Sequence, residues 1–139
     1  MTLLDVHADG RITPQQVEAA ITQDTCLVTV MYANNEIGTI QPIGEIGVDL
    51  PGPEGPFHTD AVQAAGHLAI DVGAEQIDML SLSAHKFHGP QRGLGALYVR
   101  KGVPLLPLIE GGRPGAPEAG RDGECGRHCG PGRCPPNRL

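Results

Sequence analysis

The sequence predicts an α/β fold built on a mostly parallel sheet. Three apolar runs have the length of strands, and polar residues follow each run at its C-terminal end. Ligands of open parallel sheets bind outside the carboxyl ends of the strands, so the three runs predict one shared crevice. The runs with their polar residues are 26–31 with Asn35, 56–59 with Asp60, and 77–82 with Lys86.

The first expected elements are a strand over residues 1–6 and a helix over residues 14–21. The apolar stretch 26–32 is expected to be the next strand. Asn34 and Asn35 follow it, and asparagine is common in turns because it tolerates the left-handed region. Cys26, at the head of this strand, is expected to be a buried small hydrophobic residue.

Residues 48–56 interrupt this pattern. Three prolines and two glycines between residues 51 and 56 cannot sustain a helix. If the connection before the next strand holds no helix, it is an irregular loop and one face of the sheet is left uncovered. A short strand is expected over residues 56–59. Asp60 is then placed to cap a helix that starts in residues 61–65.

The last expected strands are 79–83 and 95–99, and a turn at residues 89–90 lets them run antiparallel. Lys86 lies between them. Most lysines are simply exposed, so taken alone it is a solvated loop lysine. In this position, however, its amine is placed to form a Schiff base with a carbonyl compound or with pyridoxal phosphate.

A pyridoxal phosphate site needs further groups besides a lysine. Asp60 is a candidate to keep the pyridine nitrogen protonated, which lets the ring withdraw electrons from a substrate. Gln63 and Asn35 are candidates to bind the phenolic oxygen. Each of these residues also has a plain structural interpretation, as a helix cap or a turn, and only their joint occurrence at strand ends favours a site.

Three stretches of the chain resemble cysteine desulfurases, which are pyridoxal phosphate enzymes of the class V aminotransferase superfamily. The stretches are residues 31–47 (MYANNEIGTIQPIGEIG), 57–66 (FHTDAVQAAG) and 81–100 (SLSAHKFHGPQRGLGALYVR). The resemblance implies the large domain of the type I transferase fold with pyridoxal 5'-phosphate as cofactor. Residues 1–24 also fit this family, and there the resemblance implies a strand, a turn at residues 9–11 and a helix. It implies that Lys86 bonds the cofactor, that Asp60 pairs with the pyridine nitrogen, that Asn35 and Gln63 lie around the phenolic oxygen, and that Ser83 and His85 contact the phosphate.

For the intact enzyme, the resemblance implies removal of sulfur from L-cysteine to give L-alanine and an enzyme persulfide. It also implies a homodimer, and sulfur transfer to an acceptor protein such as one of iron–sulfur cluster assembly. A selenocysteine lyase or another class V aminotransferase-type enzyme is an alternative. A catalytically silent truncated protein is an alternative of a different class.

The length of 139 residues is about a third of such an enzyme. The family's glycine- and threonine-containing phosphate loop and its catalytic cysteine loop are expected in parts that this chain does not match. We therefore expect residues 1–111 to form a partial cofactor-binding domain that is inactive alone.

Residues 112–139 differ sharply in composition from the rest. Glycine, proline and arginine dominate, with five arginines against three acidic residues, so we expect a disordered tail. We hypothesise a one-nucleotide frameshift, because suitable codons for residues 114–132 can also read QERRRRAGTENVAGIVGLG. A zinc site in the tail lacks the paired Cys-x-x-Cys spacing, so no metal is expected.

Net charge and composition exclude other classes. A charge of −6 with two tyrosines, two phenylalanines and no tryptophan argues against a nucleic-acid surface. No apolar run approaches the roughly 20 residues of a membrane span, and no signal peptide is visible. The expectation is a soluble, cytoplasmic protein without disulfides.

Overall fold

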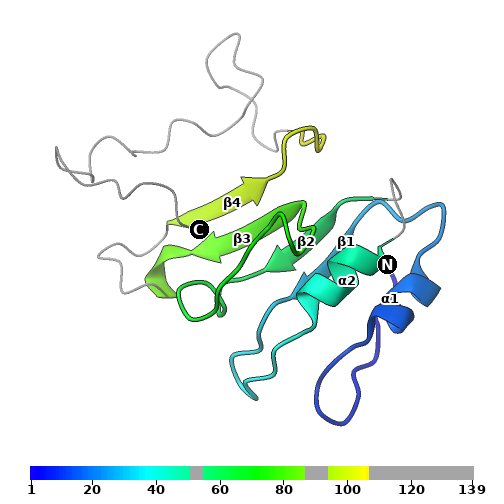
Figure 1. Ribbon diagram of the computed structural model, residues 1–139, viewed down its shortest axis with the longest axis horizontal. Helices are drawn as coiled ribbons and strands as arrows, with labels where there is room; N and C mark the ends of the chain where they lie inside the picture. The colour runs from blue at the N-terminus through cyan, green and yellow to red at the C-terminus, as the bar shows by residue number, and fades with distance from the viewer. Residues whose placement is uncertain (51–54, 87–93, 107–139) are drawn as a thin grey trace, which may run out of the picture. The chain divides into compact units, whose positions relative to one another are not determined.

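The computed structural model describes residues 1–50, 55–86 and 94–106 (Figure 1). These residues form a four-stranded sheet in the order β1-β2-β3-β4. Strands β1 to β3 run parallel, and β4 runs antiparallel to β3. This confirms the predicted α/β class and the antiparallel last pair. The strands are β1 (Val28–Met31), β2 (Phe57–Asp60), β3 (Met79–Ser83) and β4 (Gly95–Val99).

Helix α1 (Pro14–Ala20) forms where the sequence predicts it. Thr13 and Gln16 make a capping box, in which the Thr13 hydroxyl accepts from the Gln16 amide at 3.2 Å and the Gln16 side chain accepts from the Thr13 amide at 2.9 Å. This satisfies two amide groups that the first turn leaves without helical partners. Pro14 suits the first turn because it has no amide hydrogen to satisfy.

Helix α2 (Ile43–Asp49) connects β1 to β2. It ends before Pro51, which fits the expectation that the proline-rich stretch cannot continue a helix. The connection nevertheless holds a helix, because seven residues form α2 upstream of the prolines. Residues 51–54 lie outside the described structure.

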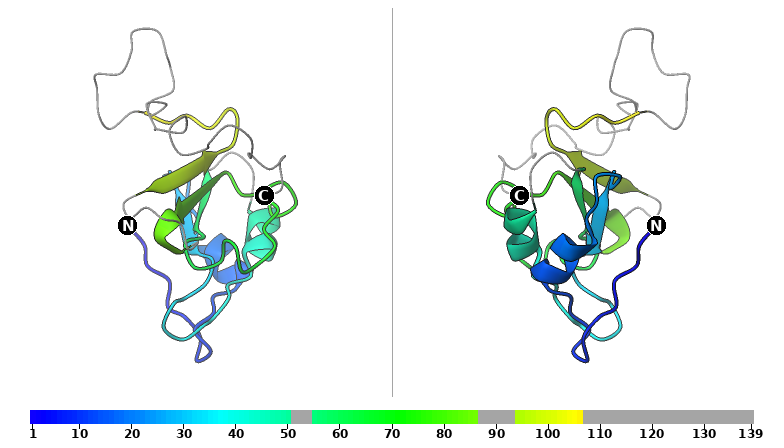
Figure 2. Two further views of the ribbon diagram at one scale, coloured as in Figure 1. Left: turned by 90° about the vertical axis from the view of Figure 1, so that its left-hand side faces the viewer. Right: turned by 90° about the vertical axis from the view of Figure 1, so that its right-hand side faces the viewer.

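Both helices cover the same face of the sheet (Figure 2). Val17 from α1 and Ile43 and Ile46 from α2 are almost fully buried in one cluster with Phe57 of β2 and Leu80 of β3. The hydrophobic effect of burying these side chains holds the layers together. Because side chains alternate along a strand, the residues between the core positions point to the other face of the sheet.

Tyr32 joins the segment after β1 to the loop before β3. Its hydroxyl donates to Glu75 Oε2 at 3.1 Å. Burial, and then the charge and hydrogen bond of Glu75, raise the pKa of Tyr32 to about 12. The phenol therefore stays neutral and can donate to the carboxylate.

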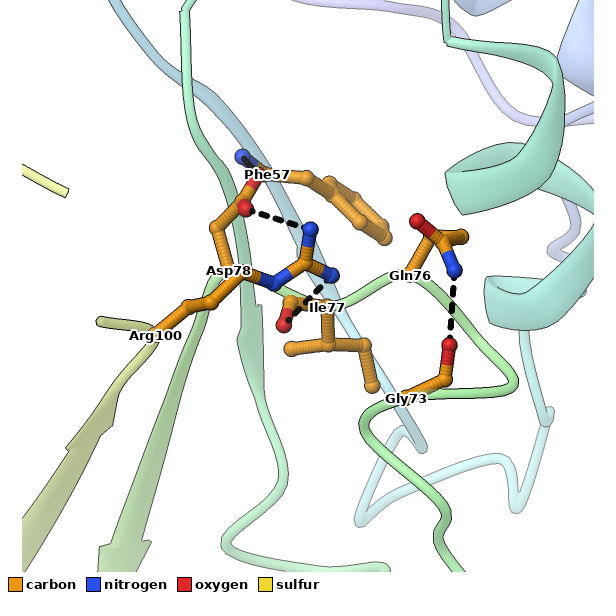
Figure 3. A network of polar contacts seen from close by, with 6 residues as sticks. All are labelled: Phe57, Gly73, Gln76, Ile77, Asp78 and Arg100. Atoms are coloured by element: carbon orange, nitrogen blue, oxygen red, sulfur yellow. Dashed lines mark hydrogen bonds and ion pairs between the residues drawn. The ribbon is translucent and has the colours of Figure 1, made fainter. Parts of the chain in front are cut away.

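A polar network joins β2, β3 and β4 at the edge of the sheet opposite to the predicted site (Figure 3). Asp78 Oδ2 accepts from the Phe57 amide at 2.8 Å, and Asp78 Oδ1 pairs with Arg100 Nη1 at 3.2 Å. Arg100 also donates to the Ile77 carbonyl at 3.2 Å. The network links the start of β2, the start of β3 and the end of β4, which helps to fix their register.

Three sequence expectations are wrong. Residues 1–6 form no strand, since none of the described strands pairs with them. Residues 61–65 form one turn rather than a helix: the Ala65 amide donates to the Ala61 carbonyl, and Gly66 follows with φ of 80°. Cys26 is exposed, not buried, because the strand begins two residues later at Val28.

The predicted turn at residues 9–11 is confirmed, with Gly10 at φ of 77°.

Several expectations fall outside the described residues. These are the turn at residues 89–90, the domain boundary at residue 111, the tail 112–139 with its frameshift hypothesis, and the zinc alternative among Cys125, His128, Cys129 and Cys134. None of the helices in the described part of the chain is long and apolar enough to cross a membrane.

Candidate functional site

The ends of β1, β2 and β3 lie in register at one edge of the sheet. The pairing places Met31 beside Asp60 and Asp60 beside Ser81. Beyond these pairs, the Tyr32 amide donates to the Asp60 carbonyl at 2.8 Å, and the Ala61 amide donates to the Ser81 carbonyl at 3.0 Å. The three chains therefore leave the sheet from aligned positions. We call this the carboxyl edge.

Lys86 reaches the carboxyl edge from β3. A single 3-10 turn, Ala84–Lys86, follows this strand directly. The Ala84 amide donates to the Leu94 carbonyl at 2.9 Å, which ties the start of this turn to the segment before β4. His85 and Lys86 are exposed. The short turn thus leaves the Lys86 amine accessible to a reactant.

Ser83 and His85 form a polar pair beside Lys86. Ser83 Oγ and His85 Nδ1 lie 2.6 Å apart, within hydrogen-bond distance. Ser83 is the last residue of β3, and His85 lies in the 3-10 turn, so the pair bridges the strand end. A hydroxyl and an imidazole at one place are suitable donors for an anionic group such as a phosphate.

Asp60 is the last residue of β2 and is exposed. Its Oδ1 accepts from the Val62 amide at 2.9 Å. This bond stabilises the turn that follows, as the capping interpretation expects. A carboxylate has two oxygens with several acceptor positions, so the bond is compatible with a second partner. Gln63 lies half-buried in the same turn.

Asn35 lies in the turn after β1 and is exposed. Its neighbour Asn34 builds this turn, because Asn34 Oδ1 accepts from the amides of Glu36 at 2.9 Å and Ile37 at 3.1 Å. Within the described residues, no hydrogen bond joins Asn35 to the groups on β2 and β3. The carboxyl edge therefore gathers the segments that carry the predicted residues, and the cofactor roles of the side chains stay predictions.

The donor set at the carboxyl edge fits pyridoxal phosphate by its chemistry. An amine suits the aldehyde, a carboxylate suits the pyridine nitrogen, amides suit the phenolic oxygen, and the Ser83–His85 pair suits the phosphate. Two open depressions, of about 940 Å³ and 470 Å³, lie elsewhere and include none of these residues. Asn35, Asp60, His85 and Lys86 are exposed in the described structure, so these residues are accessible to solvent.

A polar pair next to Asp60 was not predicted from the sequence. Thr29 Oγ1 and His58 Nδ1 lie 2.7 Å apart, on positions that pair across β1 and β2. Burial lowers the pKa of His58, and the negative charge of Asp60 acts in the opposite direction. Strand alternation could have placed His58 on the same face as Asp60, since residues two apart point the same way, but the pairing with Thr29 depends on the register of β1 and β2.

Comparison with known proteins identifies one family and relatives with similar names. Residues 1–115 match the aminotransferase class-V family. The chain is 54% identical over 112 residues to cysteine desulfurase IscS of Methanosarcina thermophila, covering 81% of this chain and 28% of the relative. It is 55% identical over 112 residues to putative cysteine desulfurase IscS 1 of Bacillus subtilis, covering 81% of this chain and 29% of the relative.

Solved structures agree with this similarity. A structure described as SspA in complex with cysteine has a TM-score of 0.75 and 52% identity over 80% of this chain and 32% of its own. A NifS-like protein has a TM-score of 0.71 and 43% identity over 77% of this chain and 30% of its own. The chain spans less than a third of the length of each of these four proteins. The match over residues 1–115 and the shared fold show that the chain belongs to the aminotransferase class-V family.

Proposed function

We propose that this chain is part of a cysteine desulfurase, an enzyme that removes sulfur from L-cysteine and gives L-alanine. The observation that carries the proposal is the register of β1, β2 and β3, which brings the segments of Asn35, Asp60 and Lys86 to one edge. The named desulfurase relatives support the choice of substrate.

Pyridoxal 5'-phosphate, when bound, supplies an electron sink for the electrons released at the α-carbon of an amino acid. Asp60 would hold a proton at the pyridine nitrogen, which keeps that sink effective. Asn35 and Gln63 would orient the ring at its phenolic oxygen, and the Ser83–His85 pair would bind the phosphate. Lys86 Nζ would bond the cofactor between turnovers and move the proton at the substrate's α-carbon.

The overall reaction conserves atoms when a thiol accepts the sulfur. The carbon–sulfur bond of cysteine breaks, its sulfur bonds to an acceptor cysteine thiolate as a persulfide, and protons complete alanine. Cys26 is unsuited to this role because it precedes β1, at the opposite edge of the sheet from Lys86. Cys26 is the only cysteine among the described residues, so we place the acceptor cysteine outside them.

The wider assignments are part of the same proposal. We place the intact enzyme in the cytoplasm as a homodimer that passes sulfur to an acceptor protein, for example in iron–sulfur cluster assembly. For the chain alone we expect weak cofactor binding and little turnover, because Asp60, His85 and Lys86 are exposed. Water at such an edge weakens the electrostatic interactions that a closed site would use.

A spectroscopic titration tests the proposal. The purified chain is mixed with pyridoxal phosphate, and the visible band of the lysine adduct is followed before and after addition of L-cysteine. The band should appear, should disappear in Lys86→Ala, and should persist in Lys101→Ala, since Lys101 lies in an exposed turn after β4. L-Cysteine should change the band, whereas L-alanine should change it less.

Other outcomes would point to other functions. A stronger response to L-selenocysteine than to L-cysteine would favour a selenocysteine lyase. Absence of the band in the wild-type chain, or a band that survives in Lys86→Ala, would favour the catalytically silent interpretation. Rapid alanine formation by the chain alone would contradict the expected low turnover.

A further inference from the structure

Some polar groups near the carboxyl edge have no part in the proposed function and are candidates for a further role. Thr29 and His58 are the strongest candidates. They occupy paired positions on adjacent parallel strands, and their side chains meet at 2.7 Å between Oγ1 and Nδ1. The threonine is β-branched and stiff in a strand, so its hydroxyl is a well-placed anchor for the imidazole ring.

The His58 ring shares a face of the sheet with Asp60. The two residues are separated by one position on β2, so their side chains point the same way, about 6.6 Å apart along the strand. This is the face opposite to Phe57 and Thr59, which point into the core. His58 therefore lies two residues before Asp60 on the same face of β2.

The other neighbours of His58 on this face are uncharged. The register places Thr29 and Met31 on the β1 side, and Met79 and Ser81 on the β3 side. Among these positions, only Asp60 carries a charge that faces the ring. Burial favours the neutral imidazole, and the carboxylate favours the imidazolium.

We propose that His58, oriented by Thr29, is a positioning residue for Asp60, an inference that rests on the proposed function. The neutral imidazole of His58 leaves the Asp60 carboxylate free to pair with the protonated pyridine nitrogen of the cofactor. The protonated imidazole competes with that nitrogen for the carboxylate. The competition is electrostatic and needs no direct contact with the cofactor. Cofactor binding should therefore weaken as pH falls and His58 becomes protonated.

The first experiment needs no cofactor. NMR titration of the histidine ring signals, with His58 assigned by its loss in His58→Gln, is compared between the wild type and Asp60→Asn. Removing the carboxylate charge should lower the pKa of His58, because the carboxylate acts to raise it. The matched control is Asp24→Asn, an exposed carboxylate in the loop before β1. Equal effects of Asp60→Asn and Asp24→Asn would overturn the proposal.

A double-mutant cycle tests the part played by Thr29. The effect of Asp60→Asn on the His58 titration should shrink in a Thr29→Val background, because the ring loses its anchor. Thr29→Ser keeps a hydroxyl and should restore the effect. An Asp60→Asn effect that is the same with threonine, valine and serine at position 29 would contradict the positioning role.

The second experiment measures affinity for pyridoxal phosphate against pH. The ratio of wild-type to His58→Gln affinity should fall as the pH is lowered from 8 to 5.5, and taking the ratio removes the cofactor's own titration. His58→Lys places a permanent cation beside Asp60 and should weaken binding about two- to fivefold at pH 7.5, the range expected for exposed charges. A constant ratio, or unchanged binding by His58→Lys, would refute the competition.

If the wild type binds no pyridoxal phosphate, the proposed function fails. The NMR titrations still decide whether the charge of Asp60 acts on His58.

Discussion

Thr59 is the clearest case at the residue scale of a side chain that works against stability. It lies in the middle of β2, is fully buried, and its hydroxyl has no hydrogen-bond partner among the described residues. A buried hydroxyl without a partner loses its hydrogen bonds to water and gains none in return. Valine has nearly the same shape and lacks this cost.

Thr59→Val should therefore stabilise the chain. We expect the free energy of unfolding to rise by about 1 kcal/mol, measured by urea denaturation. Thr29→Val is the matched control, because the Thr29 hydroxyl is exposed and bonded to His58, and it should give no such gain. A loss of stability in Thr59→Val would mean that its hydroxyl has a partner in solution.

The chemistry of single residues was partly readable from the sequence. Asp60 ends β2, one residue later than the predicted strand end, and Lys86 lies just after β3 as predicted, because polar residues at the end of an apolar run mark the strand end. The exposure of Cys26 was not readable, since it depends on where pairing begins and not on residue type. The Thr29–His58 bond was missed because it joins residues 29 positions apart that only the strand register brings together.

At the element scale, the packing of α2 depends on the close approach of one glycine to the loop before β3. Gly47 is buried, and a Cβ atom added there would collide with the carbonyl oxygen of Glu75 in the loop before β3. Backbone cannot move aside as the end of a flexible side chain can. Gly47 therefore lets α2 pack directly against that loop.

Gly47→Ala should destabilise the chain by about 1–3 kcal/mol, the usual cost of an overpacked position. Gly44→Ala is the matched control on the same helix. There the added Cβ would meet two side-chain atoms of Glu75, Cγ at 3.3 Å and Cβ at 3.9 Å, and no backbone atom. Alanine also favours helix over glycine, so Gly44→Ala should be neutral or slightly stabilising in thermal unfolding. Similar losses in both variants would show that the collision with Glu75 is not the cause.

Elements with strong local signals were predicted well. The capping residues Thr13 and Gln16 and the first-turn Pro14 mark α1, and β3 and β4 have the predicted bounds. Residues 1–6 were predicted as a strand by resemblance, but a strand also needs a partner, which the described residues do not offer. The turn at residues 61–65 does not continue into a helix because Gly66 adopts a positive φ.

At the scale of the whole molecule, the parallel order of β1 to β3 determines which segments meet. Parallel strands send their carboxyl ends to one edge, so the sequence order of strand and polar residue sufficed to predict the carboxyl edge. The closeness of the side chains could not be predicted in the same way, because Asn35 sits on a turn that Asn34 organises. The roles of the predicted site residues therefore need a chemical test.

The two lysines of the chain make that test possible. Lys86 lies at the carboxyl edge, and Lys101 follows β4, whose antiparallel direction takes it to the opposite edge. The measurement is to trap pyridoxal phosphate on the chain with borohydride and to locate the modified lysine by peptide mass spectrometry. The proposed site predicts that Lys86 carries most of the label and that Asp60→Asn reduces it selectively. Equal labelling of Lys86 and Lys101, unaffected by Asp60→Asn, would contradict a pyridoxal phosphate site at the carboxyl edge.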